Sequence, residues 1–307
     1  TYGDWSSDVC SSDLPALRAL DVFPNNLPTQ LTSFVGREKE LADVKKLLRD
    51  SHILTLIGPG GTGKTRLSIQ SANESLTNFS DGVWLVELAP ITDPALVTQT
   101  VCAALDVIPQ GNASALTVLT DYLKPKKILL VVDNCEHLID ASAQLCEVLL
   151  HACPNLTIIA SSREALGIDG ENAYRVPSLQ ESESIKLFVE RATSVFPEFE
   201  LTDSNASIIA QICQRLDGIA LAIELAAARV KTLSLEQLAS RLDDKLTLLT
   251  TGSRAAQPRQ QTLRAAIDWS YELLSEQEKI VLQRLSVFYR SEEHTSELQS
   301  PYVISYA

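Results

Sequence analysis

The sequence predicts an α/β fold, in which a parallel β-sheet is covered by helices on both faces and a helical region follows. Short apolar runs rich in β-branched residues recur at 52–58, 82–88, 127–133 and 156–162. Helical apolar spacing fills the stretches between these runs, and strands that alternate with helices form parallel sheets buried on both faces. The strand pattern ends before Pro177, and only helical patterns follow it.

The expected helices are read from apolar residues that recur every three or four positions. The first, at 36–50, carries Leu41, Val44, Leu47 and Leu48 on one face. By the same spacing, the further helices before Pro177 are expected at 64–78, 94–106, 114–123 and 136–151. Those after it are expected at 181–194, 203–215, 219–230, 234–242, 262–273 and 275–288, with a polar linker at 250–261.

Both ends of the chain are interpreted as translated sequencing adapter. A DNA string that encodes 290–303 on one strand encodes 1–14 on the other, and it resembles a common sequencing-library adapter. We therefore interpret 1–14 and 290–307 as non-native tails and exclude them from functional reasoning. The chain contains no Met, so we expect an internal fragment of a longer protein.

Composition indicates a globular protein, because 45% of the residues are hydrophobic. The net charge of −13 becomes −8 without the six acids and one Arg of the tails, so we expect DNA contacts only through domains outside this chain. No apolar run reaches the ~20 residues of a membrane span. The five cysteines outside the tails form no Cys-x-x-Cys pair. These features favour a cytoplasmic protein with free buried thiols and no membrane contact.

The strongest motif is GPGGTGKT at 58–65, which matches the phosphate-loop pattern G-x-x-x-x-G-K-[ST]. It follows a predicted strand and opens a predicted helix, so backbone N–H groups and the helix N-terminus can surround phosphates. Lys64 is expected to reach the β- and γ-phosphates, and the Thr65 hydroxyl to bind Mg²⁺. The predicted ligand is ATP or ADP with Mg²⁺. The predicted contacts are Gly58, Pro59, Gly60, Gly61, Thr62, Gly63, Lys64, Thr65 and Arg66.

Asp133 ends the predicted strand 127–133 and is the second candidate for the Mg²⁺ site. Its alternative role is to cap the helix that follows. The next residue is Asn134, whose amide can orient a water but cannot accept its proton at neutral pH. Glu136 is a weaker candidate for the base. This arrangement predicts slow hydrolysis.

Arg163 follows the predicted strand 156–162, at the edge where parallel strands deliver site residues. An Arg at this place can contact the γ-phosphate and respond to its hydrolysis. The alternative is a solvated surface Arg. Both interpretations remain open from the sequence.

Six segments in this order resemble the nucleotide-binding module of STAND-class, NB-ARC-like signalling ATPases, in particular that of bacterial transcriptional regulators of the AfsR and LuxR-like type. The phosphate loop alone is not specific to this family, but the ordered set is. The resemblance covers 27–289. Its segments are FVGREKEL (34–41), GPGGTGKT (58–65), LLVVDNCEHL (129–138), TIIASSREAL (157–166), LDGIALAIELAAAR (216–229) and 262–288.

The resemblance implies a domain order and further site residues. The implied regions are a linker at 15–30, a P-loop NTPase domain at 31–178, a helical lid at 179–248 and the start of a truncated winged-helix domain at 249–289. Val35, Gly36 and Arg37 would lie at the adenine and ribose side, and Arg163 would be the first sensor residue. Ala220 stands where the family usually has a Pro near the base, which puts adenine affinity or lid rigidity in question.

The implied function is an ATP/ADP-binding molecular switch of a bacterial signal-transducing transcriptional regulator. ADP would hold the lid and winged helix on the core, whereas ATP would release them and allow self-association. Slow Mg²⁺-dependent hydrolysis would return the switch to its resting state, provided that each nucleotide prefers one arrangement. The alternatives are a turnover P-loop ATPase or phosphotransferase, and an interaction scaffold that binds nucleotide only structurally.

Overall fold

The computed structural model describes residues 23–108, 113–242 and 276–285. The chain divides into two compact units. The first contains the residues up to Gly58 together with Lys64–Val176, and the second contains Pro59–Gly63 and the residues from Pro177 onward. The expected linker 250–261, the expected helix 262–273 and both tails lie outside the described residues.

The first unit is built on a parallel sheet of five strands, in the order β2-β3-β4-β1-β5. Four of its strands coincide with the apolar runs of the sequence, which confirms the predicted fold class. The fifth strand pairs only with β1 and is mostly exposed, so it carries no continuous apolar run. The strands are β1 (Ile53–Ile57), β2 (Val83–Glu87), β3 (Leu129–Asp133), β4 (Thr157–Ser162) and β5 (Asn172–Arg175).

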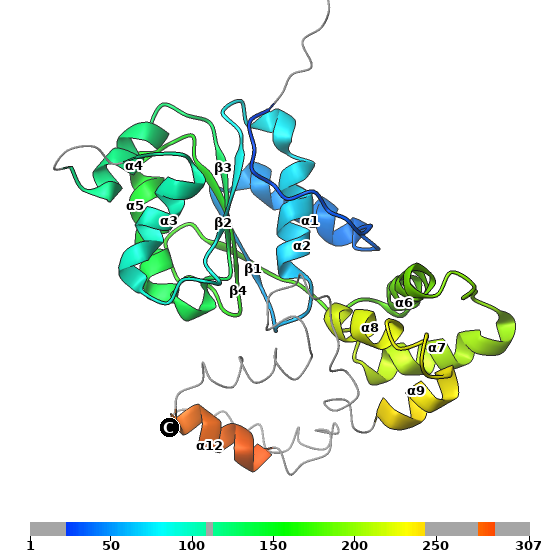
Figure 1. Cartoon of the computed structure of the whole chain (residues 1–307). Coiled ribbons are helices and arrows are strands. Elements are labelled where there is room, and N and C mark those ends of the chain that lie inside the picture. The colour runs from blue at the N-terminus through cyan, green and yellow to red at the C-terminus, as the bar shows by residue number, and fades with distance from the viewer. Residues whose placement is uncertain (1–22, 109–112, 243–275, 286–307) are drawn as a thin grey trace, which may run out of the picture. The chain divides into compact units, whose positions relative to one another are not determined.

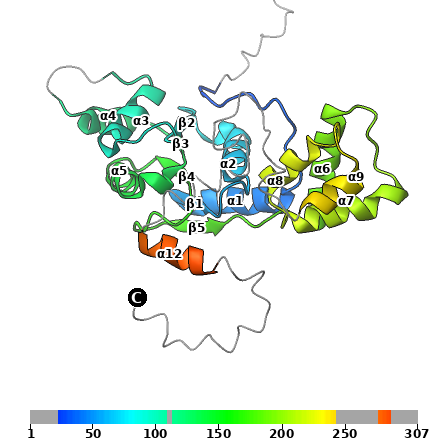
Figure 2. The ribbon, with the colours of Figure 1, turned by 60° about the horizontal axis from the view of Figure 1, so that its bottom comes forward.

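Helices cover both faces of this sheet (Figures 1 and 2). Helices α1 and α2 pack on one face, and α3, α4 and α5 on the other, which gives two apolar core layers. Each layer buries the side chains that point from the strands toward it, because successive strand residues face opposite sides. The helices are α1 (Glu38–Asp50), α2 (Lys64–Asn73), α3 (Val97–Ala104), α4 (Ala115–Leu123) and α5 (Ile139–Ala152).

Three helices of this unit differ by three or more residues from the expected bounds, and α1 and α4 differ by only one or two. Helix α2 ends at Asn73, and the expected remainder contains the 3₁₀ turn η1 (Leu76–Asn78). The start of the helix expected at 94–106 is likewise a 3₁₀ turn, η2 (Pro94–Leu96). Helix α5 begins at Ile139 instead of 136, after the 3₁₀ turn η3 (Cys135–His137). The cause is backbone geometry, since a left-handed Asn134 (φ 69°) turns the chain before a helix can start.

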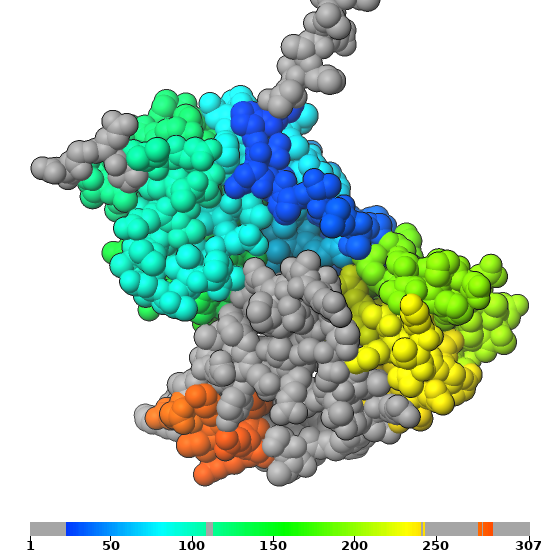
Figure 3. All heavy atoms as spheres, viewed as in Figure 1, coloured from blue at the N-terminus to red at the C-terminus, as the bar shows by residue number. Residues whose placement is uncertain are grey.

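The segment before α1 extends the sheet beyond β2. Asn26 accepts a hydrogen bond from the N–H of Leu85 (2.6 Å) and donates to the Leu85 carbonyl (2.9 Å), as a neighbouring strand would. Asn25 also forms a parallel bridge with Val83. In the space-filling view this segment, in dark blue, runs along the outside of the unit (Figure 3). It thereby covers an edge that would otherwise be open to strand pairing.

The second unit is helical, as the sequence predicts. Helix α6 packs against α7 and α8, and α7 packs against α9. Three of the helices begin with a capping box, in which the cap and the third helical residue satisfy each other's backbone N–H groups. In the described part of the chain, no helix has the length and apolar character to cross a membrane. The helices are α6 (Glu181–Val195), α7 (Asp203–Arg215), α8 (Ala220–Ala227), α9 (Leu235–Arg241) and α12 (Glu276–Leu285).

Candidate functional site

The candidate site lies at the carboxyl edge of three adjacent strands. Strand β1 leads into the phosphate-loop motif, β3 ends with Asp133, and β4 ends with Ser161 and Ser162, followed by Arg163. These strands are neighbours in the order β3-β4-β1, so their ends meet at one edge. The carboxyl edge of a parallel sheet is the usual place for ligands in open α/β folds.

Lys64 opens α2 and is the buried cation of the site. It is only 8% exposed, and its Nζ donates to the carbonyl of Gly58 at 2.7 Å. Gly63 precedes it with φ +90°, a conformation that L side chains rarely adopt. A Cβ placed at Gly63 would meet no heavy atom within 4 Å, so the space beside the loop is open. The backbone N–H groups of a Gly-rich loop, a helix N-terminus and a lysine together fit a phosphate group.

Asp133 and Thr65 are brought together as the sequence predicts. The Thr65 hydroxyl donates to Asp133 Oδ1 at 2.7 Å, and the Ser161 hydroxyl donates to the same oxygen at 2.5 Å. The carboxylate is 3% exposed and caps neither η3 nor α5. The helix-cap alternative is therefore wrong. A carboxylate beside a hydroxyl at the end of the phosphate loop supplies the oxygen ligands that Mg²⁺ takes.

Asn134 is held by Ser161 and His137, which are not among the predicted site residues. Its backbone N–H donates to Ser161 Oγ at 2.9 Å, and its side-chain nitrogen lies 3.1 Å from Nδ1 of His137. His137 Nε2 lies 2.7 Å from the carbonyl oxygen of Ile91, in the loop after β2. The detectable signal for Ser161 was a polar residue in an otherwise buried strand next to the strand of Asp133.

Arg163 and Glu136 form an ion pair across the site. Arg163 Nε lies 3.7 Å from Glu136 Oε1, and the two side chains are 22% and 6% exposed. Burial lowers the pKa of the Arg163 guanidinium, and the Glu136 carboxylate opposes this shift. Arg163 is thus a partly buried member of an ion pair. Glu136, the weaker candidate for a base, is engaged with a cation.

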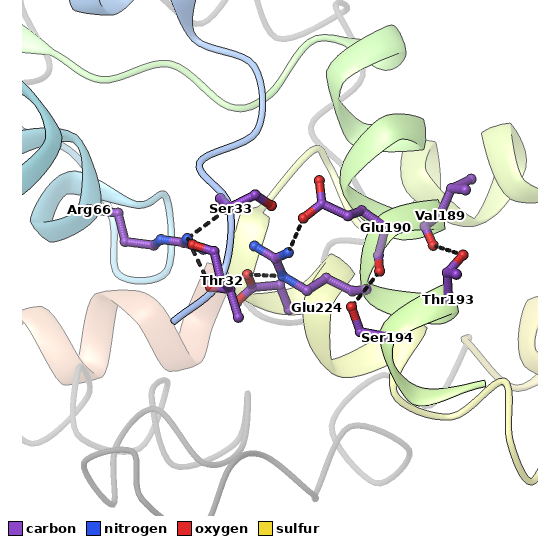
Figure 4. Close-up of polar contacts among 9 residues, drawn as sticks. Thr32, Ser33, Arg66, Val189, Glu190, Thr193, Ser194 and Glu224 are labelled. Carbon is purple, nitrogen blue, oxygen red and sulfur yellow. Dashed lines mark hydrogen bonds and ion pairs between the residues drawn. The ribbon is translucent and has the colours of Figure 1, made fainter. Parts of the chain in front are cut away.

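The segment expected on the adenine side is anchored to the start of α2. The Arg66 guanidinium donates to the carbonyls of Thr32 (3.0 Å) and Ser33 (2.8 Å) and to the Thr32 hydroxyl (Figure 4). Arg37 follows with a left-handed backbone (φ 65°) and is 3% exposed. Val35 is also buried. Arg66 therefore connects this segment to the helix that carries Lys64 and Thr65.

Ala220 is the first residue of α8 in the second unit, which also includes Pro59–Gly63. The next residue, Leu221, donates its N–H to the carbonyl of Gly61 at 3.1 Å. A Cβ at Gly61, whose φ is +81°, would lie 3.1 Å from the Leu221 Cβ. The first helical position has a free N–H in any case, so Ala and Pro are both compatible with it. Ala220 therefore directly precedes Leu221, the residue that contacts the phosphate loop at Gly61.

Comparison with known proteins is consistent with a nucleotide-binding fold. Residues 48–167 match the model of the AAA domain family. The chain is 47% identical over 246 residues to a protein of Mycobacterium tuberculosis that is provisionally named an HTH-type transcriptional regulator, covering 80% of the chain and 28% of that protein. It is also 23% identical over 251 residues to the regulatory protein AfsR of Streptomyces griseus, covering 76% of the chain and 25% of AfsR.

Among solved structures, the Walker-type ATPase PABY2304 of Pyrococcus abyssi matches with a TM-score of 0.52 and 15% identity, over 71% of the chain and 74% of the ATPase. This likeness shows the fold alone. The chain spans about 28% of the length of the mycobacterial regulator that it matches. The chain therefore has a P-loop NTPase fold, matches the AAA domain family over residues 48–167 and is similar to a segment of bacterial regulatory proteins.

Proposed function

We propose that the chain is the ATP/ADP-binding switch of a bacterial signal-transducing transcriptional regulator. The observation that carries this proposal is the contact between Thr65 and Asp133 beside the buried Lys64. A cation, a hydroxyl and a carboxylate converge there at the end of a phosphate loop. The similarity to regulatory proteins supplies the wider context.

Each of these residues has a task that follows from its chemistry. Lys64 leaves the neutral carbonyl of Gly58 and pairs with the β- and γ-phosphates, which offer a full negative charge. Thr65 and Asp133 hold Mg²⁺ through their oxygens. Mg²⁺, when bound, neutralises charge on the phosphates. Arg163 contacts the γ-phosphate after it parts from Glu136, so it distinguishes ATP from ADP.

Hydrolysis is slow in this proposal because the residue after Asp133 is an amide. Asn134 accepts a hydrogen bond from the attacking water but cannot take its proton. Glu136 is a carboxylate, yet it contacts Arg163 in the structure. The site therefore retains ATP for long enough to act as a signal.

The regulatory steps lie in the second unit. We assign 179–248 as a helical lid and 249–289 as the beginning of a winged-helix domain, with Val35, Gly36, Arg37 and Ala220 on the base side. Residues 243–275 and 286–289 of these two regions lie outside the described residues. ADP holds the closed arrangement, and ATP releases it and permits self-association. Contact with DNA belongs to domains outside this chain.

The test measures assembly and turnover in the same preparation. We expect a larger molar mass by light scattering with a non-hydrolysable ATP analogue and Mg²⁺ than with ADP and Mg²⁺, and turnover well below about one per second. Sustained turnover above a few per second would instead identify a turnover ATPase or phosphotransferase. Equal mass and equal protease sensitivity with the two nucleotides would identify a scaffold.

A further inference from the structure

We propose that His137 is a positioning residue that fixes the orientation of the Asn134 side-chain amide. The proposal rests on the role given above to Asn134, which is to accept a hydrogen bond from the attacking water. It assigns a task to His137 through its contacts with Ile91 and Asn134.

The surroundings of the imidazole determine its tautomer. His137 Nε2 lies 2.7 Å from the carbonyl oxygen of Ile91. A carbonyl oxygen only accepts hydrogen bonds, so Nε2 carries the proton. In the neutral ring Nδ1 is then an acceptor. Nδ1 of His137 therefore requires a hydrogen-bond donor as its partner.

The tautomer in turn determines the orientation of the amide. Nδ1 of His137 lies 3.1 Å from the side-chain nitrogen of Asn134. Only the NH₂ group of the amide can donate to a lone pair, so the reversed amide would place two acceptors against each other. The amide oxygen of Asn134 consequently occupies the side away from the imidazole.

The backbone of Asn134 is also held in place. Its φ of 69° is left-handed, and its N–H donates to Ser161 Oγ, which donates to Asp133 Oδ1. Asn134 is 7% exposed. A continuous series of contacts therefore connects Ile91, in the loop after β2, to the carboxylate of Asp133.

This orientation matters because the two ends of an amide differ toward water. An amide oxygen accepts a hydrogen bond from the water and leaves a lone pair of the water directed elsewhere, as attack on a phosphate requires. The NH₂ end would instead occupy that lone pair. His137 thus keeps the accepting end of Asn134 available.

The first test is the tautomer itself, read from ¹⁵N shifts of the wild-type chain with labelled histidine. The signals of His137 are identified by their loss in His137→Asn. We expect the proton on Nε2 and a bare Nδ1. A proton on Nδ1 in the neutral ring would overturn the proposal. This measurement needs neither nucleotide nor hydrolysis, so it decides the inference even if the proposed function fails.

The second test compares two matched substitutions in single-turnover ATP hydrolysis. An Asn oxygen can replace Nδ1 as the acceptor for Asn134, whereas a Gln nitrogen can replace Nε2 as the donor to Ile91. We expect His137→Gln to lower the rate about tenfold with unchanged ATP affinity, and His137→Asn to keep most of it. The reverse order would show that only the contact with Ile91 matters and would overturn the role assigned to Asn134.

A double substitution separates this role from a general structural one. In an Asn134→Ala background the imidazole has no amide to orient, so His137→Gln should produce no further loss. A loss of equal size in both backgrounds would overturn the proposal. Absence of hydrolysis or of nucleotide binding in every variant would count against the proposed function, and the tautomer would then decide the inference alone.

Discussion

The two units bury charged residues for different purposes. In the first unit Lys64 and Asp133 come from different elements at the carboxyl edge of the sheet, where Lys64 donates to the carbonyl of Gly58 and Asp133 accepts from Thr65. In the second unit Arg191 of α6 connects this helix to α8 through Glu224, which lies 2.9 Å from its Nε, whereas its Nη1 lies 2.8 Å from Glu190 of α6 itself (Figure 4). Arg191 is 9% exposed.

This difference distinguishes buried charges that bind a ligand from buried charges that stabilise the fold. Removing a charge from water is costly unless a partner compensates it. Arg191 has two carboxylates within its own unit, so its compensation is complete before any ligand binds. Lys64 gains its strongest partner from an anionic ligand. Substitutions should therefore affect binding in one region and stability in the other.

The largest expected effect follows from Lys64→Ala. This change removes the cation of the phosphate loop, and we expect the affinity for ADP and for ATP to fall about a hundredfold, or about 2.7 kcal/mol. Isothermal titration calorimetry in the presence of Mg²⁺ measures it. Lys45→Ala is the matched control, because Lys45 forms a surface pair with Glu74 in the same unit. Unchanged affinity in Lys64→Ala would contradict the site assignment.

The second prediction concerns Arg191→Met, which keeps the apolar stem and removes the guanidinium. We expect the free energy of local unfolding of α6 and α8 to fall by about 1–3 kcal/mol, because two partly buried carboxylates lose their cation. Native-state hydrogen exchange of amides in these helices measures it. Nucleotide affinity should change far less than in Lys64→Ala.

A matched control for Arg191→Met is Lys279→Ala in α12. Lys279 pairs with Glu276, whose side chain is 85% exposed, so its removal should cost little. Equal effects of the two substitutions on α6 and α8 would contradict the view that Arg191 joins these helices.

The third prediction distinguishes the two candidate residues after Asp133. We expect Asn134→Asp to raise the hydrolysis rate about tenfold, because a carboxylate can accept the proton of the water. Glu136→Gln should lower the rate by less than about threefold, because Glu136 contacts Arg163. Single-turnover hydrolysis with purified variants measures both. The opposite order of effects would make Glu136 the base.

The sequence predicted the strands and the contact between Thr65 and Asp133 because both depend on short-range patterns. A buried parallel strand is an apolar run, and the phosphate loop is a continuous motif. Once strands alternate with helices, their carboxyl ends must share an edge. Asp133 could therefore be placed beside Thr65 without a structure.

The contacts of His137, Ser161 and Arg66 could not be predicted, because each joins elements that lie far apart in the sequence. His137 meets the carbonyl of Ile91, 46 positions earlier in the chain. The turn η3 also has no sequence signal of its own, since its cause is the left-handed backbone of Asn134. Backbone geometry of this kind is visible only in the folded chain.

The smallest expected effect concerns the surface pair of Lys45 and Glu74, which tests whether burial is what separates the two classes of charge. A hydrogen bond from Lys45 lowers the pKa of Glu74 below its ordinary value of 4.5. The pair therefore stabilises the fold above pH 4.5, and this contribution is lost as the pH falls through the lowered value. Both side chains are about one-third exposed, so solvent screens the pair to about 0.2–1 kcal/mol.

For Glu74→Gln we accordingly expect a loss of less than about 1 kcal/mol at pH 7, measured by hydrogen exchange in α1 and α2 at low salt. The difference from the wild type should vanish in acid, once the Glu74 carboxyl is protonated, and shrink in about 1 M salt. Arg191→Met should instead keep most of its effect in salt, because water and ions reach its pair less easily. A Glu74 effect that survives both acid and salt would contradict a screened surface pair, and burial would then no longer explain why the charges of the two units behave differently.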